Sequence, residues 1–430
     1  MGGGLMQLVA YGAQDVYLTG SPQITFFKLV YRRHTNFAVE SIEQVFNGTP
    51  GFGKKASATI SRNGDLITQV FLQITVPQLG GAPNDVQLVN SFAHALVESC
   101  EIEIGGQRID KHYAAYYEVC DELMCPEEKR IGYGKMIGKM YDTDGKPKPG
   151  TAMSDAKLDE HMGRLGSSTY YMPLRFWFNN NPGLALPLIS LQYHEVKLQF
   201  AFSDASKVVL KDANADGTYT SFAAFAEQPE ISLYVDYVYL DTEERRRFAQ
   251  VSHEYLIEQL QFTGVETYSL SATSVKTEKI RLNFNHPCKE LIFFVHPAGT
   301  VEKPFEFGEG VTANGSTIVG YDYINQASLL LNGHDRFSSR KGSYFRLVVP
   351  FQVHTRVPSR HIYCYSFALR PEEHQPSGSC NFSRIDNASL HLTFNQSALA
   401  AEEQISFTVY ALSYNILRIM SGMGGLAYSN

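Results

Sequence analysis

The sequence predicts an all-β fold in which two similar sandwich domains follow one another along the chain. Short runs rich in Val, Ile, Phe, Tyr and Thr alternate with turn sequences such as RNGD at 62–65. Segments of the first half recur in the second half in the same order. These patterns are typical of two consecutive eight-stranded antiparallel jelly rolls, a double jelly roll, with a few short helices.

The expected strands are apolar or alternating segments of strand length bounded by Gly, Pro, Asn and Asp. Their β-branched and aromatic residues favour a pleated, half-buried surface. The clearest of these segments cover residues 56–61, 66–76, 195–202, 231–240, 291–296, 344–354, 388–394 and 404–412.

An internal duplication supports the division into two domains. The segment SIEQVF at 41–46 is similar to LIEQLQF at 256–262, and residues 101–118 parallel residues 328–345. Gln44 and Gln259 are 215 positions apart (259 − 44), and Gly106 and Gly333 are 227 apart (333 − 106). Since the order is preserved while the offset changes, we expect two copies of one β-domain with loops of different length.

Three helices are expected. Residues 242–250 (TEERRRFAQ) begin with acidic and continue with basic residues, which suits the helix dipole. Residues 21–33 offer Ser21 as N-cap and Pro22 at the first position, and residues 114–124 form the third candidate. The predicted organisation is an N-terminal arm (1–26), a first jelly-roll domain (27–241), a helical linker (242–254), a second jelly-roll domain (255–418) and a C-terminal tail (419–430).

Composition excludes several classes of protein. The net charge of −7 and the lack of a basic stripe argue against direct nucleic-acid binding. Six scattered cysteines without a CxxC pair predict buried free thiols in a reducing compartment, although one disulfide is an alternative. The N-terminus lacks the pattern of a signal peptide, and the longest apolar run, at 183–191, is too short to span a bilayer. We therefore expect a soluble protein made in the cytosol.

The stretch RPEEHQPSGSCNFSRIDN at 370–387 has the residue types of a chemical site. Glu372, Glu373, His374, Ser379 and Cys380 lie within a few positions of one another. Consecutive residues cannot all face one point on a strand, and the prolines and glycine here favour a tight corner. A structural corner is therefore preferred to a metal site.

Other motif-like segments are incomplete. Residues 48–55 resemble a phosphate-binding loop, but Lys55 replaces the required Ser or Thr, so a hairpin is expected. Residues 212–217 begin like a calcium loop whose twelfth position is Ala223, which favours a polar surface loop over a weak calcium site. Residues 253–259 lack the second His of a zinc protease motif, and the chain has no His-x-His pair. We expect no enzyme activity, no metal and no cofactor.

Several long segments carry a family resemblance. Residues 3–42 strongly resemble the N-terminus of the double jelly-roll major capsid proteins of nucleocytoplasmic large double-stranded DNA viruses, above all those of algal viruses (phycodnaviruses). The segments SRNGDLI at 61–67, HPCKELIF at 286–293, 369–387 and 415–430 are similar to the same family. The resemblance covers nearly the whole chain and is weakest at 122–168 and 301–322.

The resemblance implies two jelly rolls in a homotrimer with a pseudo-hexagonal outline, which tiles the icosahedral shell of the virion. It implies contacts with neighbouring capsomers and with minor capsid and penton proteins. The N-terminal arm would face the inner capsid layer, and synthesis and assembly would occur in the host cytoplasm. The predicted function is therefore a structural major capsid protein.

Two other functions compete with this one. A carbohydrate- or receptor-binding protein of the virion surface would also use jelly rolls. A hydrolase or metal oxygenase finds no supporting motif in the sequence.

Glycosylation is a further expectation from the resemblance, because algal-virus relatives carry unusual glycans. Asn-x-Ser/Thr sequons occur at Asn47, Asn314, Asn381, Asn387 and Asn395. Asn314, in the loop TANGST, is the predicted acceptor, since Asn381 and Asn387 lie in the corner.

Overall fold

The computed structural model describes most of the chain. The chain divides into two units. The described residues are 3–77, 86–139, 168–211, 220–223, 225, 227–271, 273–297, 304–307, 311–313, 316–318, 322–396 and 403–428. One unit is Met1–Asn36 and the other is Phe37–Asn430, here called the body.

The N-terminal unit contains two short helices, α1 (Gly3–Val9) and α2 (Asp15–Thr19), neither of which has a buried residue. The helix predicted at 21–33 is wrong, because these residues form no regular secondary structure. Phe26, Phe27 and Tyr31 are all more than four-fifths exposed. A short helix is only marginally stable unless an apolar face packs against another element, and residues 3–36 include no buried side chain.

The first domain of the body is built on two four-strand sheets, each with additions. One sheet has the order β1 (Phe37–Gln44), β13 (Glu230–Leu240), β4 (Leu66–Val76) and β8 (Ser168–Pro173). The other has the order β3 (Lys55–Thr59), β10 (Val196–Phe202), β6 (Val97–Ile104) and β7 (Gln107–Tyr113). The additions are β2 (Phe46–Asn47), β9 (Leu186–Pro187) and a small sheet of β12 (Thr220–Ser221), β11 (Val209–Lys211) and β5 (Val86–Leu88).

The second domain repeats this arrangement. Its first sheet has the order β14 (His253–Leu270), β24 (Glu403–Met420), β16 (Pro287–Pro297) and β21 (Ile362–Ser366). Its second has the order β15 (Lys276–Arg281), β23 (Ala388–Phe394), β19 (Ile324–Leu331) and β20 (His334–Lys341). The additions are β22 (Cys380–Asn381), β25 (Met423–Leu426) and the pair β17 (Val311–Ala313) and β18 (Ser316–Ile318).

The two domains match strand by strand. In each, the first long strand pairs antiparallel with the last, β1 with β13 and β14 with β24. The remaining strands then follow in equivalent positions, so the predicted double jelly roll is confirmed. In the described part of the chain, each domain has two sheets of four equivalent strands, and the short additional strands extend these sheets or form small separate ones.

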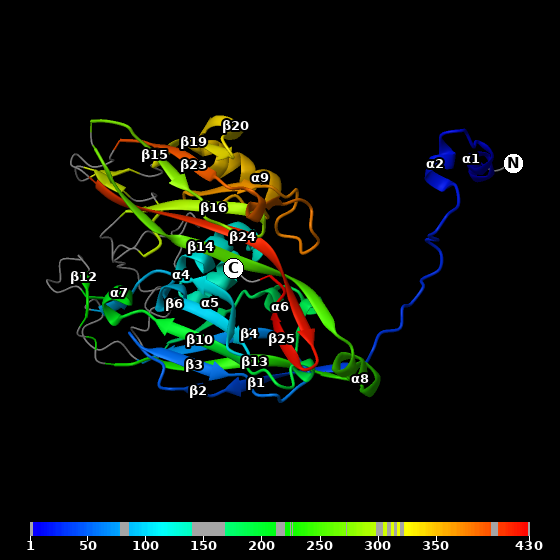
Figure 1. The fold of residues 1–430 in the computed structure, drawn as a ribbon. Helices are drawn as coiled ribbons and strands as arrows, with labels where there is room; N and C mark the ends of the chain where they lie inside the picture. The colour runs from blue at the N-terminus through cyan, green and yellow to red at the C-terminus, as the bar shows by residue number, and fades with distance from the viewer. Residues whose placement is uncertain are drawn as a thin grey trace. The chain divides into compact units, whose positions relative to one another are not determined.

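Helices connect the strands, and α4 (Ala114–Met124) and α5 (Glu127–Ile137) lie between the sheets of the two domains (Figure 1). The predicted helices at 114–124 and 242–250 are confirmed as α4 and α8. Asp241 caps α8 by accepting a hydrogen bond from the Thr242 amide at 2.7 Å. The helices are α3 (Phe92–Leu96), α4 (Ala114–Met124), α5 (Glu127–Ile137), α6 (Trp177–Asn180), η1 (Pro182–Leu184), η2 (Leu188–Ser190), α7 (Ala205–Val208), α8 (Thr242–Gln250), η3 (Tyr344–Val348), α9 (Val349–Val353) and η4 (Phe382–Arg384).

One predicted strand is wrong. Residues 344–354 form the π-helical turn η3 followed by α9. Phe345 and Val349 are buried four positions apart, which is the spacing of one helix face rather than the alternation of a strand. Pro350 is the second residue of α9, which follows η3 directly.

Candidate functional site: the contact between the two domains

The first sheet of the second domain is buried on both faces. In β16, Leu291, Phe293 and Val295 point into the core of the second domain. The intervening Ile292 and Phe294 belong to a core shared with the first domain. Because neighbouring residues of a strand face opposite sides, the outer face of this sheet is the surface that receives the first domain.

Helix α4 of the first domain packs on that outer face. The rings of Tyr116 and Tyr410 lie 6.1 Å apart at an angle of 85°. The rings of Tyr113 and Phe262 lie 4.8 Å apart in a T-shaped arrangement. Aromatic pairs of this geometry contribute beyond the area they bury, so the two domains form a packed unit within the body.

A buried ionic cluster lies beside this contact. The ammonium of Lys139, just after α5, is 2.8 Å from Glu118, 2.5 Å from Asp121 and 2.7 Å from Glu122. These carboxylates lie on one face of α4, since positions three and four apart on a helix are neighbours. All four side chains are at most 1% exposed.

The second domain completes the charge balance of this cluster. Arg360 lies 3.3 Å from Glu118 and Arg356 lies 3.5 Å from Glu122. The Arg356 side chain also donates to the main-chain carbonyls of Glu122 and Asp121, both at 2.9 Å. Three cations therefore accompany three carboxylates, and two of those cations come from the other domain.

The cations determine the protonation of the cluster. Burial acts to raise the pKa of Glu122, but Lys139, Arg360 and Arg356 outweigh it and lower that pKa to about 2. Burial likewise opposes ionisation of Glu118, whose pKa the charges of Lys139 and Arg360 nevertheless hold well below its usual value. Glu118 and Glu122 thus stay ionised despite their burial.

The three carboxylates are also spaced like metal ligands, with candidate ligand atoms within 4.8 Å of one another. Lys139 occupies the position at which a cation would bind. The arrangement is explained by the ammonium and the two guanidinium groups, and a metal ion would have to displace them.

The corner at 370–387 lies at the edge of the same contact, and its polar side chains diverge. Glu372 accepts hydrogen bonds from the amide and hydroxyl of Thr355 and lies 2.9 Å from His354. Glu373 instead pairs with Arg370 at 3.0 Å, and Cys380 lies in β22. The structure therefore confirms a corner.

His354 ties this corner to the sheet. Its ring lies between the carboxylates of Glu290, at 3.1 Å, and Glu372, at 2.9 Å. Burial acts to lower the pKa of His354, but Glu290 and the hydrogen bonds around the ring raise it far above its ordinary value. The charged imidazolium thereby fixes the end of α9 against β16.

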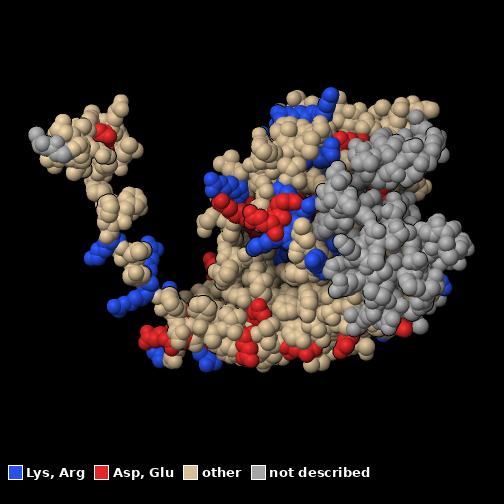
Figure 2. Space-filling model, turned by 180° about the vertical axis from the view of Figure 1, so that it is seen from behind, with Lys and Arg blue, Asp and Glu red and all other residues tan. Residues whose placement is uncertain are grey.

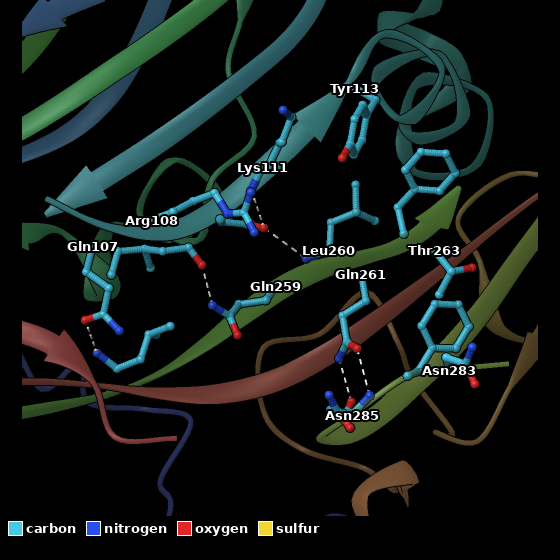
Figure 3. A pocket seen from close by; sticks show the side chains of 15 residues that line it. Gln107, Arg108, Lys111, Tyr113, Gln259, Leu260, Gln261, Thr263, Asn283 and Asn285 are labelled. Atoms are coloured by element: carbon cyan, nitrogen blue, oxygen red, sulfur yellow. Dashed lines mark hydrogen bonds between the residues drawn. The ribbon is translucent and has the colours of Figure 1, made fainter. Parts of the chain in front are cut away.

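A polar cavity of about 490 Å³ opens between β7 and β14 (Figure 3). The Gln259 amide donates to the Ile109 carbonyl, and the Leu260 amide donates to Asp110 at 3.1 Å. Gln261 accepts from the Asn285 amide at 2.8 Å and donates to its carbonyl at 2.5 Å. The side chains of Gln259 and Asp110 thus satisfy backbone groups of the other domain, whereas Gln261 satisfies backbone groups within the second domain.

Of the other motif-like segments, those at 48–55 and 253–259 lie among the described residues and have structural roles. Residues 48–55 connect the antiparallel strands β2 and β3, as the hairpin prediction states. Residues 253–259 lie in β14. All six cysteines are free thiols, five of them buried. The segment 212–217 and the predicted glycan acceptor Asn314 lie outside the described residues.

Two of the other sequons, Asn381 and Asn387, lie in the corner and are exposed. Asn395 is different, because its amide nitrogen donates to the Asp322 carbonyl at 2.6 Å.

Comparison with known families covers nearly the whole chain. A family model described as "Major capsid protein N-terminus" matches residues 25–241. One described as "Large eukaryotic DNA virus major capsid protein" matches residues 244–425. The chain belongs to this family of major capsid proteins. It is a structural subunit of the viral capsid shell, as the family resemblance implied.

Individual relatives align with this chain along their full length. The major capsid protein of Pyramimonas orientalis virus is 50% identical over 453 residues, with both chains covered completely. That of Paramecium bursaria Chlorella virus 1 is 46% identical over 471 residues, again with complete coverage. These names are those of structural proteins, and no enzyme family is indicated.

Solved structures confirm the fold. A quasi-atomic capsid structure of Paramecium bursaria Chlorella virus 1 has a TM-score of 0.77 and 41% identity, covering 94% of this chain and 100% of that one. The Faustovirus major capsid protein has a TM-score of 0.72 at 14% identity, over 95% of this chain and 94% of that one. The second likeness concerns the fold alone.

Sequence reasoning missed the ionic cluster. Glu118, Asp121 and Glu122 were visible as an acidic helix face, but Lys139, Arg356 and Arg360 join them only through the fold.

Among the described residues, no helix is long and apolar enough to span a bilayer.

Proposed function

We propose that three copies of this capsid protein associate into one capsomer with six similar lobes. The observation that carries the proposal is the repeated sheet order, which gives each chain two equivalent domains side by side. Three chains arranged around one axis would then present a pseudo-hexagonal outline and could tile a hexagonal lattice. Closed symmetry of this kind reuses the same surfaces in every subunit.

The capsomer would act through association rather than catalysis. Neighbouring capsomers are its expected lateral partners, and minor capsid and penton proteins are expected at the inner face and the vertices. Many weak contacts repeated over a shell give stability without tight pairwise binding.

The N-terminal arm, residues 1–26, is the part proposed to face the inner capsid layer. Exposed apolar side chains such as Leu8, Tyr17 and Phe26 are concentrated there. Exposed apolar patches of this kind are typical of surfaces that a partner covers.

The domain boundaries proposed from the sequence are 27–241 and 255–418, with 1–26 as the arm, 242–254 as the linker and 419–430 as the tail. The two family models meet near α8, which supports a linker there.

Light scattering after size exclusion tests the trimer. A mass of three times 48.1 kDa is expected. A single-chain mass at every concentration, with no hexagonal arrays in electron micrographs, would exclude self-association as the mechanism.

Asn314 remains the proposed glycan acceptor. Peptide mapping of protein purified from virions should find the added mass on the peptide that contains it. Unmodified Asn314 with sugar on Asn381 or Asn387 would reject this assignment, since both of those residues are exposed.

A further inference from the structure

Two cysteines of the second domain lie directly opposite one another in neighbouring strands. Cys288 is the second residue of β16, and Cys380 is the first residue of β22. The antiparallel register of these strands pairs Cys288 with Cys380 and Pro287 with Asn381. Since the two cysteines are 92 positions apart along the chain (380 − 288), only the fold brings them together.

The side chains of these two cysteines belong to the same core. Cys288 is a fully buried member of the core of the second domain. Cys380 packs against that core and remains partly exposed. Residues directly opposite in an antiparallel pair have their side chains on one face of the sheet. The two thiols are therefore neighbours within one apolar cluster.

The position of the pair in its ladder suits the span of a disulfide. The Phe382 amide donates to the His286 carbonyl at 3.1 Å, which marks these two residues as a hydrogen-bonded pair. Cys288 and Cys380 lie two positions further along each strand, so they fall at the next hydrogen-bonded position. The Cα atoms of such a pair are about 5.5 Å apart. That separation lies within the range of about 4.4–6.8 Å that a disulfide bridges.

The other four cysteines have no such partner. Cys100 and Cys364 lie opposite residues other than cysteine in their ladders. Cys120 lies in α4 and Cys125 directly follows this helix, five positions on, whereas neighbours on a helix face are three or four positions apart. All six cysteines lie among the described residues, so strand register places one pair of them opposite each other.

Little holds the two sulfurs of this pair apart. The Cys288 thiol donates to the Glu290 carbonyl at 3.1 Å, a weak hydrogen bond that rotation towards Cys380 gives up. Strand β22 has two residues and, in the described part of the chain, pairs with β16 alone. Its backbone is therefore less constrained than that of a strand paired on both edges, and it can shift as a bond between the sulfurs forms.

We propose that Cys288 and Cys380 form a site of reversible oxidation, whose oxidant is a low-molecular-weight disulfide such as glutathione disulfide. Both residues are thiols in the structure. Oxidation ties the corner at 370–387 covalently to β16, an inner strand of its sheet, and thereby stabilises the second domain. Both sulfurs belong to one chain, so the reaction needs no second copy of the protein and does not depend on the proposed trimer.

The reaction consists of two thiol–disulfide exchanges. Cys380, the partly exposed member of the pair, attacks one sulfur of glutathione disulfide as a thiolate, and the S–S bond of the oxidant breaks to release one glutathione thiolate. Cys288 then attacks the sulfur of Cys380 in the mixed disulfide and displaces the second glutathione thiolate. The two protons lost by the cysteines pass to the two released thiolates. The protein loses two electrons and the oxidant gains them, so one glutathione disulfide gives two glutathione thiols.

Electrostatics favours Cys380 as the first nucleophile. Partial burial raises the pKa of the Cys380 thiol, and the positive charge of Arg336 acts to lower it. Burial and the Glu290 carboxylate raise the pKa of the Cys288 thiol far above its ordinary value. Because the thiolate is the attacking form, the exchange begins at the thiol that has a cation beside it and access to solvent.

The surface near Cys380 is basic. Arg336, Arg340 and Lys341 are exposed on β20, an edge strand of the second sheet of this domain. Figure 2 shows Lys and Arg gathered at the edge of the body formed by the second domain, where Figure 1 places β20. Glutathione disulfide carries a net negative charge at neutral pH, so a basic surface raises its local concentration.

Peptide mapping of the full-length protein tests the proposal. The native chain is incubated with glutathione disulfide, its remaining thiols are alkylated, and it is digested with trypsin and Glu-C endoproteinase without reduction. The second protease is needed because cleavage after Glu373 separates Cys380 from Cys364. We expect residues 282–289 joined to residues 374–384, and dithiothreitol should resolve this species into its two peptides.

Two matched variants separate this pair from general oxidation of the chain. Cys380→Ser removes one member of the pair, and Cys125→Ser removes a thiol of the first domain instead. The oxidant should raise the melting temperature of the wild type and of Cys125→Ser by at least about 5 °C, because a cross-link across a long loop restricts the unfolded chain. It should leave the melting temperature of Cys380→Ser unchanged and give no cross-linked peptide.

Three results would overturn the proposal. Native protein in which Cys288 and Cys380 end up alkylated, or each bound to glutathione, would show that the two sulfurs do not reach one another. The mixture of cross-links that is expected when the chain is oxidised in urea would, if found in the native protein, show that the fold does not select this pair. A cross-linked wild type with an unchanged melting temperature would contradict the stabilisation of the second domain.

Discussion

Lys139 is the buried cation that the carboxylates of α4 surround. Its ammonium lies 2.5–2.8 Å from three carboxylates of α4 and is fully buried. Removing one partner of a buried pair leaves an uncompensated charge, which costs more than the pair contributes.

We predict that Lys139→Met lowers the free energy of unfolding by about 3–5 kcal/mol. Glu254→Ala is the control, because Glu254 forms a surface pair with Arg418 in which both side chains are at least half exposed. That control should cost at most about 1 kcal/mol. Urea denaturation followed by fluorescence measures both, and equal costs would contradict the account.

Glu122 should make stability depend on pH. Its pKa falls from 4.5 to about 2 on folding, so its contribution is fully present above about pH 4.5 and is lost as the pH falls towards 2. The full shift corresponds to roughly 3 kcal/mol. The stability advantage of the wild type over Glu122→Gln should therefore shrink between pH 6 and pH 3, whereas a constant advantage would show that ionisation of Glu122 is not involved.

Only part of this cluster is visible in the sequence. Glu118, Asp121 and Glu122 have the spacing of one helix face, and α4 was predicted correctly. The cations could not be found in the same way. Lys139 follows a different helix, and Arg356 lies more than 200 positions away, so only the tertiary structure brings them together.

At the scale of elements, secondary structure is predicted correctly where the apolar residues follow either the strand or the helix spacing clearly. The strands at 66–76 and 388–394 were predicted with the bounds that β4 and β23 have, because turn residues bound clear apolar patterns. The prediction fails at 344–354, where a continuous apolar run fits either a strand or a helix. It also fails at 21–33, where capping signals are present but no packing surface supports a helix.

Strand β16 allows the two cores to be tested separately. Phe293 faces the core of the second domain and Phe294 faces the first domain. Each Phe→Ala change should cost about 3–5 kcal/mol. Hydrogen exchange should then increase mainly in β19 and β23 for Phe293→Ala, and in α4 for Phe294→Ala. The same exchange pattern for both variants would contradict the assignment of the two faces.

At the scale of the molecule, the body should fold without the N-terminal unit. The described residues of that unit contain no buried side chain, so removing residues 1–36 takes nothing from the cores. We expect the truncated chain to keep the melting temperature of the full chain within a few degrees. A large drop would mean that the unit contributes to the stability of the body.

Two equivalent domains per chain should become six lobes in a trimer. Electron microscopy of the purified full-length protein tests it most directly. We predict class averages with threefold symmetry and six lobes of similar size. Particles with two lobes, or rings containing a different number of chains, would contradict the account.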